Sequence, residues 1–185
     1  KLGAVILAAG YSSRMGDFKA TMRLGDKRVI QRVISAARDA GVADIAVVSG
    51  FKRDALQPFL DGAREVYNKD YDQGMFSSVQ AGVSALDPSL DGFFLMPVDC
   101  PLIDPGVLTA LTDRFQRDSG CFYVPCYRGK KGHPLLIDGC YRQDIIDHDG
   151  AGGLKAITDR DDSKMIRIDV DCEGVLLDMD DPEGY

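Results

Sequence analysis

The residues with the clearest chemical potential lie between positions 4 and 19. An unbroken apolar run, Ala4 to Ala9, is long enough for one strand that is buried on both faces, as in a parallel sheet. It ends at Gly10, and a loop of small residues with two cations, Arg14 and Lys19, follows. Small residues let backbone N–H groups approach a ligand, and clusters of such groups bind anions. The pattern predicts a site for a polyphosphate, although strands of this kind also occur in α/β proteins that bind no phosphate.

One acidic position, Asp99, is a candidate for holding a metal ion. The apolar run 92–96 predicts another buried strand, which leads to Asp99 in a short proline-rich turn. Ligands of open α/β sheets bind beyond the carboxyl ends of strands, where a stiffly held carboxylate suits Mg²⁺. The alternative role, a helix cap, is better assigned to Asp104, which precedes Pro105. A second acidic run, 178–183, contains Asp180, and its charges repel one another unless a cation or solvent screens them.

Two polar segments have both a structural and a functional interpretation. Gly74 turns the chain before a predicted helix that Ser77 or Ser78 can cap, which would leave N–H groups and a hydroxyl near a ligand at the sheet edge. The basic segment 127–137 contains His133 and reads as a hairpin-like loop that returns into a strand. Its glycines and cations either seat an anionic acceptor or form an exposed turn. His133 titrates near neutrality if unperturbed, but we favour a positioning role over proton transfer.

The remaining elements must bring these residues together. Helical periodicity predicts helices over 29–40, 53–60, and from Asp104 to about Arg117. Strands are predicted over 45–48, 65–67, 121–126, 165–170 and 175–177. Strands that alternate with helices indicate an α/β fold, a three-layer, doubly wound and mostly parallel sheet.

The composition argues against several kinds of protein and several kinds of binding partner. The 185 residues suit one domain, 1–185, and no apolar run approaches the roughly 20 residues of a membrane span. A formal net charge of −7 argues against nonspecific nucleic-acid binding. Five scattered cysteines with only two histidines do not suggest a zinc cluster, and they favour reduced thiols in the cytoplasm. We therefore expect no membrane and no nucleic-acid partner.

The basic loop has a more specific resemblance. The pattern Leu7-Ala8-Ala9-Gly10-x-Ser12-Ser13-Arg14-Met15-Gly16-x-x-Lys19 resembles the signature of nucleotidyltransferases that activate sugars, polyols and molybdopterin. Within these it is most similar to the molybdenum cofactor nucleotidyltransferases (MobA/MocA type). Six ordered segments carry the resemblance along nearly the whole chain, which implies a Rossmann-like nucleotidyltransferase fold. The nucleotide-binding residues that it implies are Leu7, Ala8, Ala9, Gly10, Ser12, Ser13, Arg14, Lys19, Gly74, Ser78 and Asp99.

The resemblance also implies a role for each charged residue. Arg14 and Lys19 would neutralise charge on phosphate oxygens, and Asp99 with Asp180 would hold Mg²⁺, which makes Arg14, Lys19 and Asp99 the expected catalytic residues. The run Gly132, His133 and Pro134 is similar to the acceptor-binding segment of the family. The chain departs from the family pattern at Cys100, which is often glutamine. It also lacks the arginine expected at Gly152 or Gly153, so an acceptor contact assigned to that arginine is in doubt.

The activity that follows is transfer of a nucleoside monophosphate from a nucleoside triphosphate to the phosphate of molybdopterin, with release of pyrophosphate. Ala8-Ala9-Gly10 is more like the CTP-using members, and a molybdoenzyme client is a further expected partner. The alternatives are a sugar- or polyol-phosphate cytidylyltransferase and a non-catalytic nucleotide-sensing domain. We also expect the chain to be cut from a longer polypeptide, because it begins at Lys1 and its relatives continue beyond the acidic run into a final helix.

Overall fold

A mixed sheet forms the centre of the molecule. The computed structural model describes residues 1–10, 18–118 and 120–179, and all statements below concern these. The sheet has eight strands in the order β10-β7-β9-β6-β1-β4-β5, with β8 paired to β7. Their bounds are β1 Leu2–Leu7, β4 Asp44–Ser49, β5 Arg64–Tyr67, β6 Gly92–Pro97, β7 Phe122–Tyr127, β8 Lys130–Lys131, β9 Leu135–Asp138 and β10 Met165–Asp169. A separate two-stranded hairpin joins β2 (Arg23–Leu24) to β3 (Lys27–Arg28).

Most strands run in the same direction. β1 is parallel to β4 and β6, β4 to β5, and β7 to β10, whereas β9 is antiparallel to both β6 and β7. The mostly parallel sheet predicted from the sequence is therefore confirmed. From β1 the chain winds outward through β4 to β5, and then returns to the other side of β1 as β6. The carboxyl ends of β1 and β6 consequently lie where the winding direction reverses, and open α/β sheets bind ligands at this edge.

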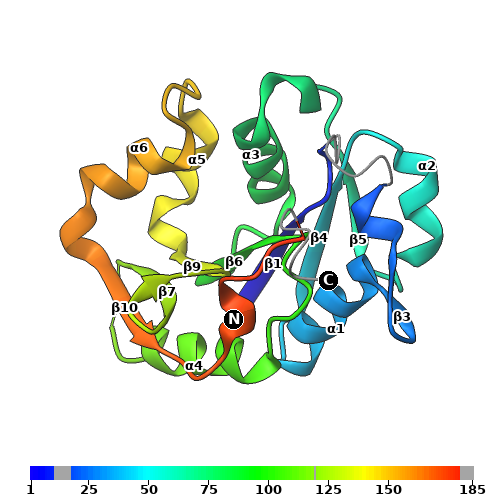
Figure 1. The fold of residues 1–185 in the computed structure, drawn as a ribbon. Helices are drawn as coiled ribbons and strands as arrows, with labels where there is room; N and C mark the ends of the chain where they lie inside the picture. Colours follow the sequence, from blue (N-terminus) through cyan, green and yellow to red (C-terminus); the bar gives the residue numbers. More distant parts are fainter. Residues whose placement is uncertain (11–17, 119, 180–185) are drawn as a thin grey trace.

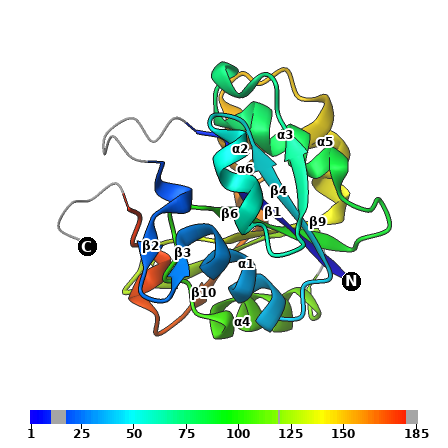
Figure 2. The same ribbon diagram turned by 90° about the vertical axis from the view of Figure 1, so that its right-hand side faces the viewer.

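Helices cover both faces of the sheet (Figure 1). α1 (Val29–Asp39) and α4 (Pro105–Phe115) pack on one face, and α3 (Met75–Ala85), α5 (Arg142–Asp147) and α6 (Gly153–Arg160) on the other. The view in Figure 2 shows the same layers from the side of β5, where the short α2 (Arg53–Leu56) lies. None of the helices in the described ranges is long and apolar enough to cross a membrane.

The position of β1 in the centre of the sheet explains why its sequence is uniformly apolar. Ala4 and Ile6 belong to the core on the α1 and α4 side, while Val5 belongs to the core under α3. Both faces are thus buried, as the unbroken run predicts. On the α3 side, a side chain at Gly82 would overlap Val5, so α3 lies directly on β1.

Two local predictions are wrong. Neither Ser77 nor Ser78 caps α3, because the helix begins at Met75 and its N-cap is Gly74, whose φ of 103° and ψ of 168° favour glycine. The segment 175–177 is not a strand. Glu173–Val175 forms a short 3-10 turn, η6, and the Val175 carbonyl accepts one hydrogen bond from the His133 N–H instead of joining a strand ladder.

Other boundaries agree closely with expectation. Asp104 is the N-cap of α4 and accepts a hydrogen bond from the Gly106 N–H, as its place before Pro105 predicts. The predicted helix over 53–60 begins correctly at Arg53, but α2 ends at Leu56 and a 3-10 turn, Gln57–Phe59, carries the proline.

Candidate active site

The loop that follows β1 starts at the carboxyl edge of the sheet, where the strand order reverses. Leu7 is the last residue of β1, and its carbonyl accepts a hydrogen bond from the Val98 N–H at 3.1 Å, which ties it to the end of β6. Beyond it, the Ala8 N–H donates to Val48 (3.0 Å), and the Ala9 carbonyl accepts from Phe51 (3.1 Å). The start of the loop is therefore fixed between β4 and β6. Of the predicted loop residues, Ser12, Ser13 and Arg14 lie outside the described residues.

Lys19 returns to the same part of the fold after the loop. It begins a 3-10 turn, η1 (Lys19–Thr21), and its side chain is only 4% exposed. The preceding Phe18 packs edge-on against Phe51, with ring centroids 6.5 Å apart. Because Phe51 holds the Ala9 carbonyl, these contacts connect the Lys19 turn to the start of the β1 loop.

The start of α3 brings a buried hydroxyl to this edge of the sheet. Gly74 precedes the helix and Ser78 lies in its first turn, where it is 4% exposed. The Asn68 side chain, directly after β5, donates a hydrogen bond to the Ser78 Oγ at 3.0 Å. Our sequence reasoning missed Asn68. The available signal was a polar residue placed immediately after a predicted strand, at the carboxyl edge where ligands bind.

Asp99 meets the segment that follows β10. It lies just beyond the end of β6, and its backbone carbonyl accepts a hydrogen bond from the Met179 N–H at 3.0 Å. The chain between Asp169 and Met179 thus crosses the carboxyl edge of the sheet from β10 to β6. Asp180, the second predicted metal ligand, lies outside the described residues, but its described neighbour is bonded to Asp99.

The predicted acceptor-binding residues contact the same segment. Gly132, His133 and Pro134 link β8 to β9, which begins beside the end of β6. The His133 N–H donates to the Val175 carbonyl at 2.8 Å, and a side chain at Gly132 would overlap that carbonyl. Gly132 is therefore required for the close approach of the two segments.

Two carboxylates influence the protonation of His133. Burial lowers the pKa of His133 below its usual value, while the charges of Asp99 and Asp178 act in the opposite direction. His133 therefore lies near both acids, one from the end of β6 and one from the segment after η6.

This arrangement fits a hard divalent cation that is shared with a phosphate ligand. Within the described ranges, no group of three histidine, cysteine or acidic side chains is placed to hold a metal ion. Mg²⁺ is commonly bound by one or two carboxylates together with waters and substrate phosphates, so a complete protein cage is not required. The carboxylates on this rim provide oxygen donors of the type that Mg²⁺ and Mn²⁺ prefer.

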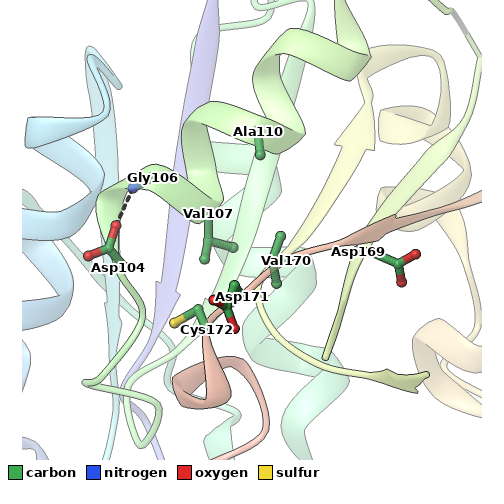
Figure 3. Close-up of a pocket in the computed structure, with 8 residues that line it drawn as sticks. All are labelled: Asp104, Gly106, Val107, Ala110, Asp169, Val170, Asp171 and Cys172. Atoms are coloured by element: carbon green, nitrogen blue, oxygen red, sulfur yellow. Dashed lines mark hydrogen bonds between the residues drawn. The ribbon is translucent and has the colours of Figure 1, made fainter. Parts of the chain in front are cut away.

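A cavity nearby has a different character. It has a volume of about 350 Å³ and lies between the start of α4 and the end of β10 (Figure 3). Three of its lining residues are the acids Asp104, Asp169 and Asp171, and the first of these caps α4. The cavity contains none of the predicted site residues. The edge of the sheet at the ends of β1 and β6 remains the candidate nucleotide site.

The structure thus gathers the described site residues along one rim. Leu7, Ala8, Ala9 and Gly10 lie at its centre, with Gly74 and Ser78 on the α3 side and Asp99 with Gly132, His133 and Pro134 on the β9 side. The fold and this rim define a doubly wound α/β protein whose candidate ligand site lies at the reversal of strand order.

The family assignment agrees with this class. The family model of the MobA-like NTP transferase domain matches residues 4–165, and the chain belongs to this nucleotidyltransferase family. It is 25% identical to the molybdenum cofactor cytidylyltransferase of Escherichia coli K12, over 100% of this chain and 93% of that protein.

Solved structures show the same fold. The crystal structure of Rv0371c from Mycobacterium tuberculosis superposes with a TM-score of 0.86 at 25% identity, covering 100% of this chain and 94% of that one. A structure of Rv0371c in complex with manganese has a TM-score of 0.80 at 22% identity, covering 100% and 95%. The predicted family and fold are therefore confirmed.

Proposed function

We propose that this chain transfers the cytidylyl group of CTP to the phosphate of molybdopterin and releases pyrophosphate. One observation carries the proposal: the Met179 N–H is bonded to the Asp99 carbonyl at 3.0 Å, beside the start of the β1 loop. Three parts of the chain that are distant in sequence thereby share one rim. Full-length similarity to a molybdenum cofactor cytidylyltransferase supports this choice of substrates.

The reaction is an in-line displacement at the α-phosphorus. A phosphate oxygen of the acceptor forms the new bond to phosphorus, the bond from phosphorus to the bridging oxygen breaks, and pyrophosphate leaves with that oxygen and its electron pair. A phosphate acceptor already carries a nucleophilic oxyanion, so no general base is required. The task of the protein is positioning and charge neutralisation.

Each part of the rim has a distinct role in this proposal. Backbone N–H groups of the β1 loop hold the triphosphate, and Arg14 with Lys19 neutralises charge on its oxygens. Gly74 and Ser78 contact the nucleoside. Gly132, His133 and Pro134 orient the acceptor, while Asp99 and Asp180 hold Mg²⁺, which supplies Lewis-acid charge neutralisation when bound.

The choice of CTP rests on the β1 loop. Ala8-Ala9-Gly10 has alanine where GTP-using relatives tend to carry an additional glycine. We also propose a cytoplasmic enzyme that delivers its product to a molybdoenzyme.

The experiment is a matrix of triphosphates and acceptors. A thermal-shift screen with Mg²⁺ and each of CTP, GTP, UTP and ATP identifies the nucleotide first, since a ligand at 100 times its dissociation constant stabilises by about 2.7 kcal/mol. Pyrophosphate release is then measured with the selected nucleotide and molybdopterin, a sugar phosphate or a polyol phosphate. Turnover with CTP and molybdopterin alone is the expected result. Turnover only with a sugar phosphate or a polyol phosphate would identify that compound as the acceptor in place of molybdopterin. Nucleotide binding without any turnover would indicate a sensing domain.

A further inference from the structure

Buried polar side chains are concentrated around the candidate nucleotide site. A polar group is costly to bury unless it is hydrogen-bonded, so such residues require an explanation. Among the described residues, five polar or charged ones are buried: Lys19, Ser49, Asn68, Ser78 and Thr158. All but Thr158 lie at the ends of β4 and β5, in the turn after the β1 loop, or in the first turn of α3.

The carboxamide of Asn68 has a defined orientation. Its backbone N–H donates to the Ser49 carbonyl at 2.9 Å, which fixes the residue at the end of β5. Its side-chain Oδ1 accepts a hydrogen bond from the Asp70 N–H at 3.0 Å. A backbone N–H only donates, so the oxygen must face Asp70 and the amide nitrogen must face the opposite way.

That nitrogen donates to two consecutive hydroxyl groups whose surroundings differ. Asn68 Nδ2 lies 2.9 Å from the Ser77 Oγ and 3.0 Å from the Ser78 Oγ. The Ser77 hydroxyl is itself within 2.9 Å of the Asp70 carbonyl and 2.8 Å of the Gly74 carbonyl, so its proton is donated to the backbone. For the Ser78 hydroxyl proton, the described part of the chain provides no acceptor.

We propose that Asn68 is a positioning residue that holds the Ser78 hydroxyl as a hydrogen-bond donor toward an acceptor atom of the bound nucleoside. Because Asn68 donates to the Ser78 oxygen, the serine proton is directed away from Asn68. The atom that receives it is an oxygen or ring nitrogen of the base, or an oxygen of the ribose. This inference rests on the proposed function, since it requires the nucleotide to bind at this rim.

The test reverses the direction of this hydrogen bond. In Asn68→Asp the side chain keeps its size and still accepts from Asp70, but it can only accept from the serines, so the Ser78 proton turns inward. Isothermal titration calorimetry with CTP and Mg²⁺ measures the dissociation constant. We expect it to rise at least about tenfold in Asn68→Asp and in Ser78→Ala. Ser77→Ala, the matched control, should change it less than about threefold.

A double-mutant cycle separates this role from a general effect of the new charge. If Asn68 acts through Ser78, then Asn68→Asp adds little to the dissociation constant in the Ser78→Ala background. The inference would be overturned if Asn68→Asp raised the dissociation constant by the same factor in both backgrounds. It would also be overturned if Ser77→Ala and Ser78→Ala raised the dissociation constant equally. Asn68→Ala, in the same cycle, replaces Asn68→Asp if that variant fails to fold in a thermal melt.

Two nucleotide analogues then identify the receiving atom. If the penalty of Asn68→Asp disappears with 2′-deoxy-CTP or 3′-deoxy-CTP, the corresponding ribose oxygen is the acceptor, and if it persists with both, the acceptor is on the base. Wild-type protein that binds no nucleoside triphosphate would refute the proposed function together with this inference. Normal binding with an uncoupled cycle would refute the inference alone.

Discussion

A lysine side chain is rarely buried, yet Lys19 is 4% exposed in a turn that contacts the start of the β1 loop. Burial of an ammonium group is costly unless opposite charge compensates it. A triphosphate provides such charge, as does the carboxylate-rich rim around Asp99. Lys19 and Asp99 have opposite charges and complementary tasks in the proposed reaction, so removal of either charge alone should lower the reaction rate.

We expect Lys19→Met and Asp99→Asn each to lower the rate of pyrophosphate release at least about a hundredfold while the protein stays folded. Methionine keeps the apolar stem of the lysine. Asparagine keeps the size of the aspartate side chain and an oxygen that can accept from the Cys100 Sγ, and the bond from Met179 uses the backbone of Asp99. Steady-state kinetics and a thermal melt of each variant provide the measurement. Lys27→Met is the control, because the ammonium group of this exposed lysine donates only to the Ser35 Oγ among the described residues. Near-normal turnover in either site variant would contradict its assigned role.

At the scale of elements, one carboxylate connects four segments at the edge of the sheet. Glu65 in β5 accepts hydrogen bonds from Ser49 in β4, Arg53 in α2 and Gln57 in the following turn. These donors, Arg53 above all, lower the pKa of Glu65 from 4.5 to about 2. Such a group stabilises the fold fully above pH 4.5, and the contribution is lost as the pH falls toward 2.

We therefore expect Glu65→Gln to lower the free energy of unfolding by about 1–2 kcal/mol at pH 7, a value reduced for solvent screening because Arg53 is 43% exposed. The deficit relative to wild type should shrink between pH 4.5 and 2, where the wild-type carboxylate becomes protonated. Urea unfolding at pH 7, 4 and 3 measures it. Asp113→Asn, an exposed site on α4, should change stability by less than about 0.5 kcal/mol at each pH. A deficit independent of pH would contradict the assignment to charge.

The elements that the sequence predicts well are those with strong patterns. β1 and β6 are apolar throughout because both faces are covered, and α1 has the periodicity of a helix with one buried face. The sequence places the start of α3 too late because serine is a common N-cap, whereas here a glycine with positive φ, Gly74, is the N-cap. The two-residue strands β2, β3 and β8 are too short for any periodicity to indicate them.

The candidate site was predictable to the extent that the strand-end rule applies. That rule placed Asp99 at the carboxyl edge of the sheet, and the structure ties this edge to the end of β1 through the bond from Val98 to Leu7. The same rule covers Asn68, which directly follows β5, but an asparagine after a strand is equally typical of a turn, so the sequence alone does not assign it to the site. Its importance depends on two serines nine and ten residues away, a contact that only the folded chain provides.

At the scale of the whole molecule, the rim depends on a segment that returns from the far end of the sheet. The chain after β10 contacts three regions in succession: Gly174 lies against Leu102, Val175 against His133, and Met179 against Asp99. Gly174 does not have a positive φ, so it is needed for close approach rather than for an unusual backbone conformation. A methyl group there would push the segment away from the loop that follows β6.

We expect Gly174→Ala to reduce kcat/KM for pyrophosphate release at least about tenfold, because displacement of the segment separates Asp178 and Met179 from Asp99. The added methyl overlaps the Leu102 backbone, so the free energy of unfolding should fall by about 1–3 kcal/mol. This corresponds to a melting temperature that is lower by about 2–12 °C. Kinetics at a temperature where both proteins are folded separate the two effects. Glu173→Ala, at the adjacent exposed position, should leave both quantities nearly unchanged. If Gly174→Ala lost stability but kept full activity, the segment would support the fold without forming part of the active site.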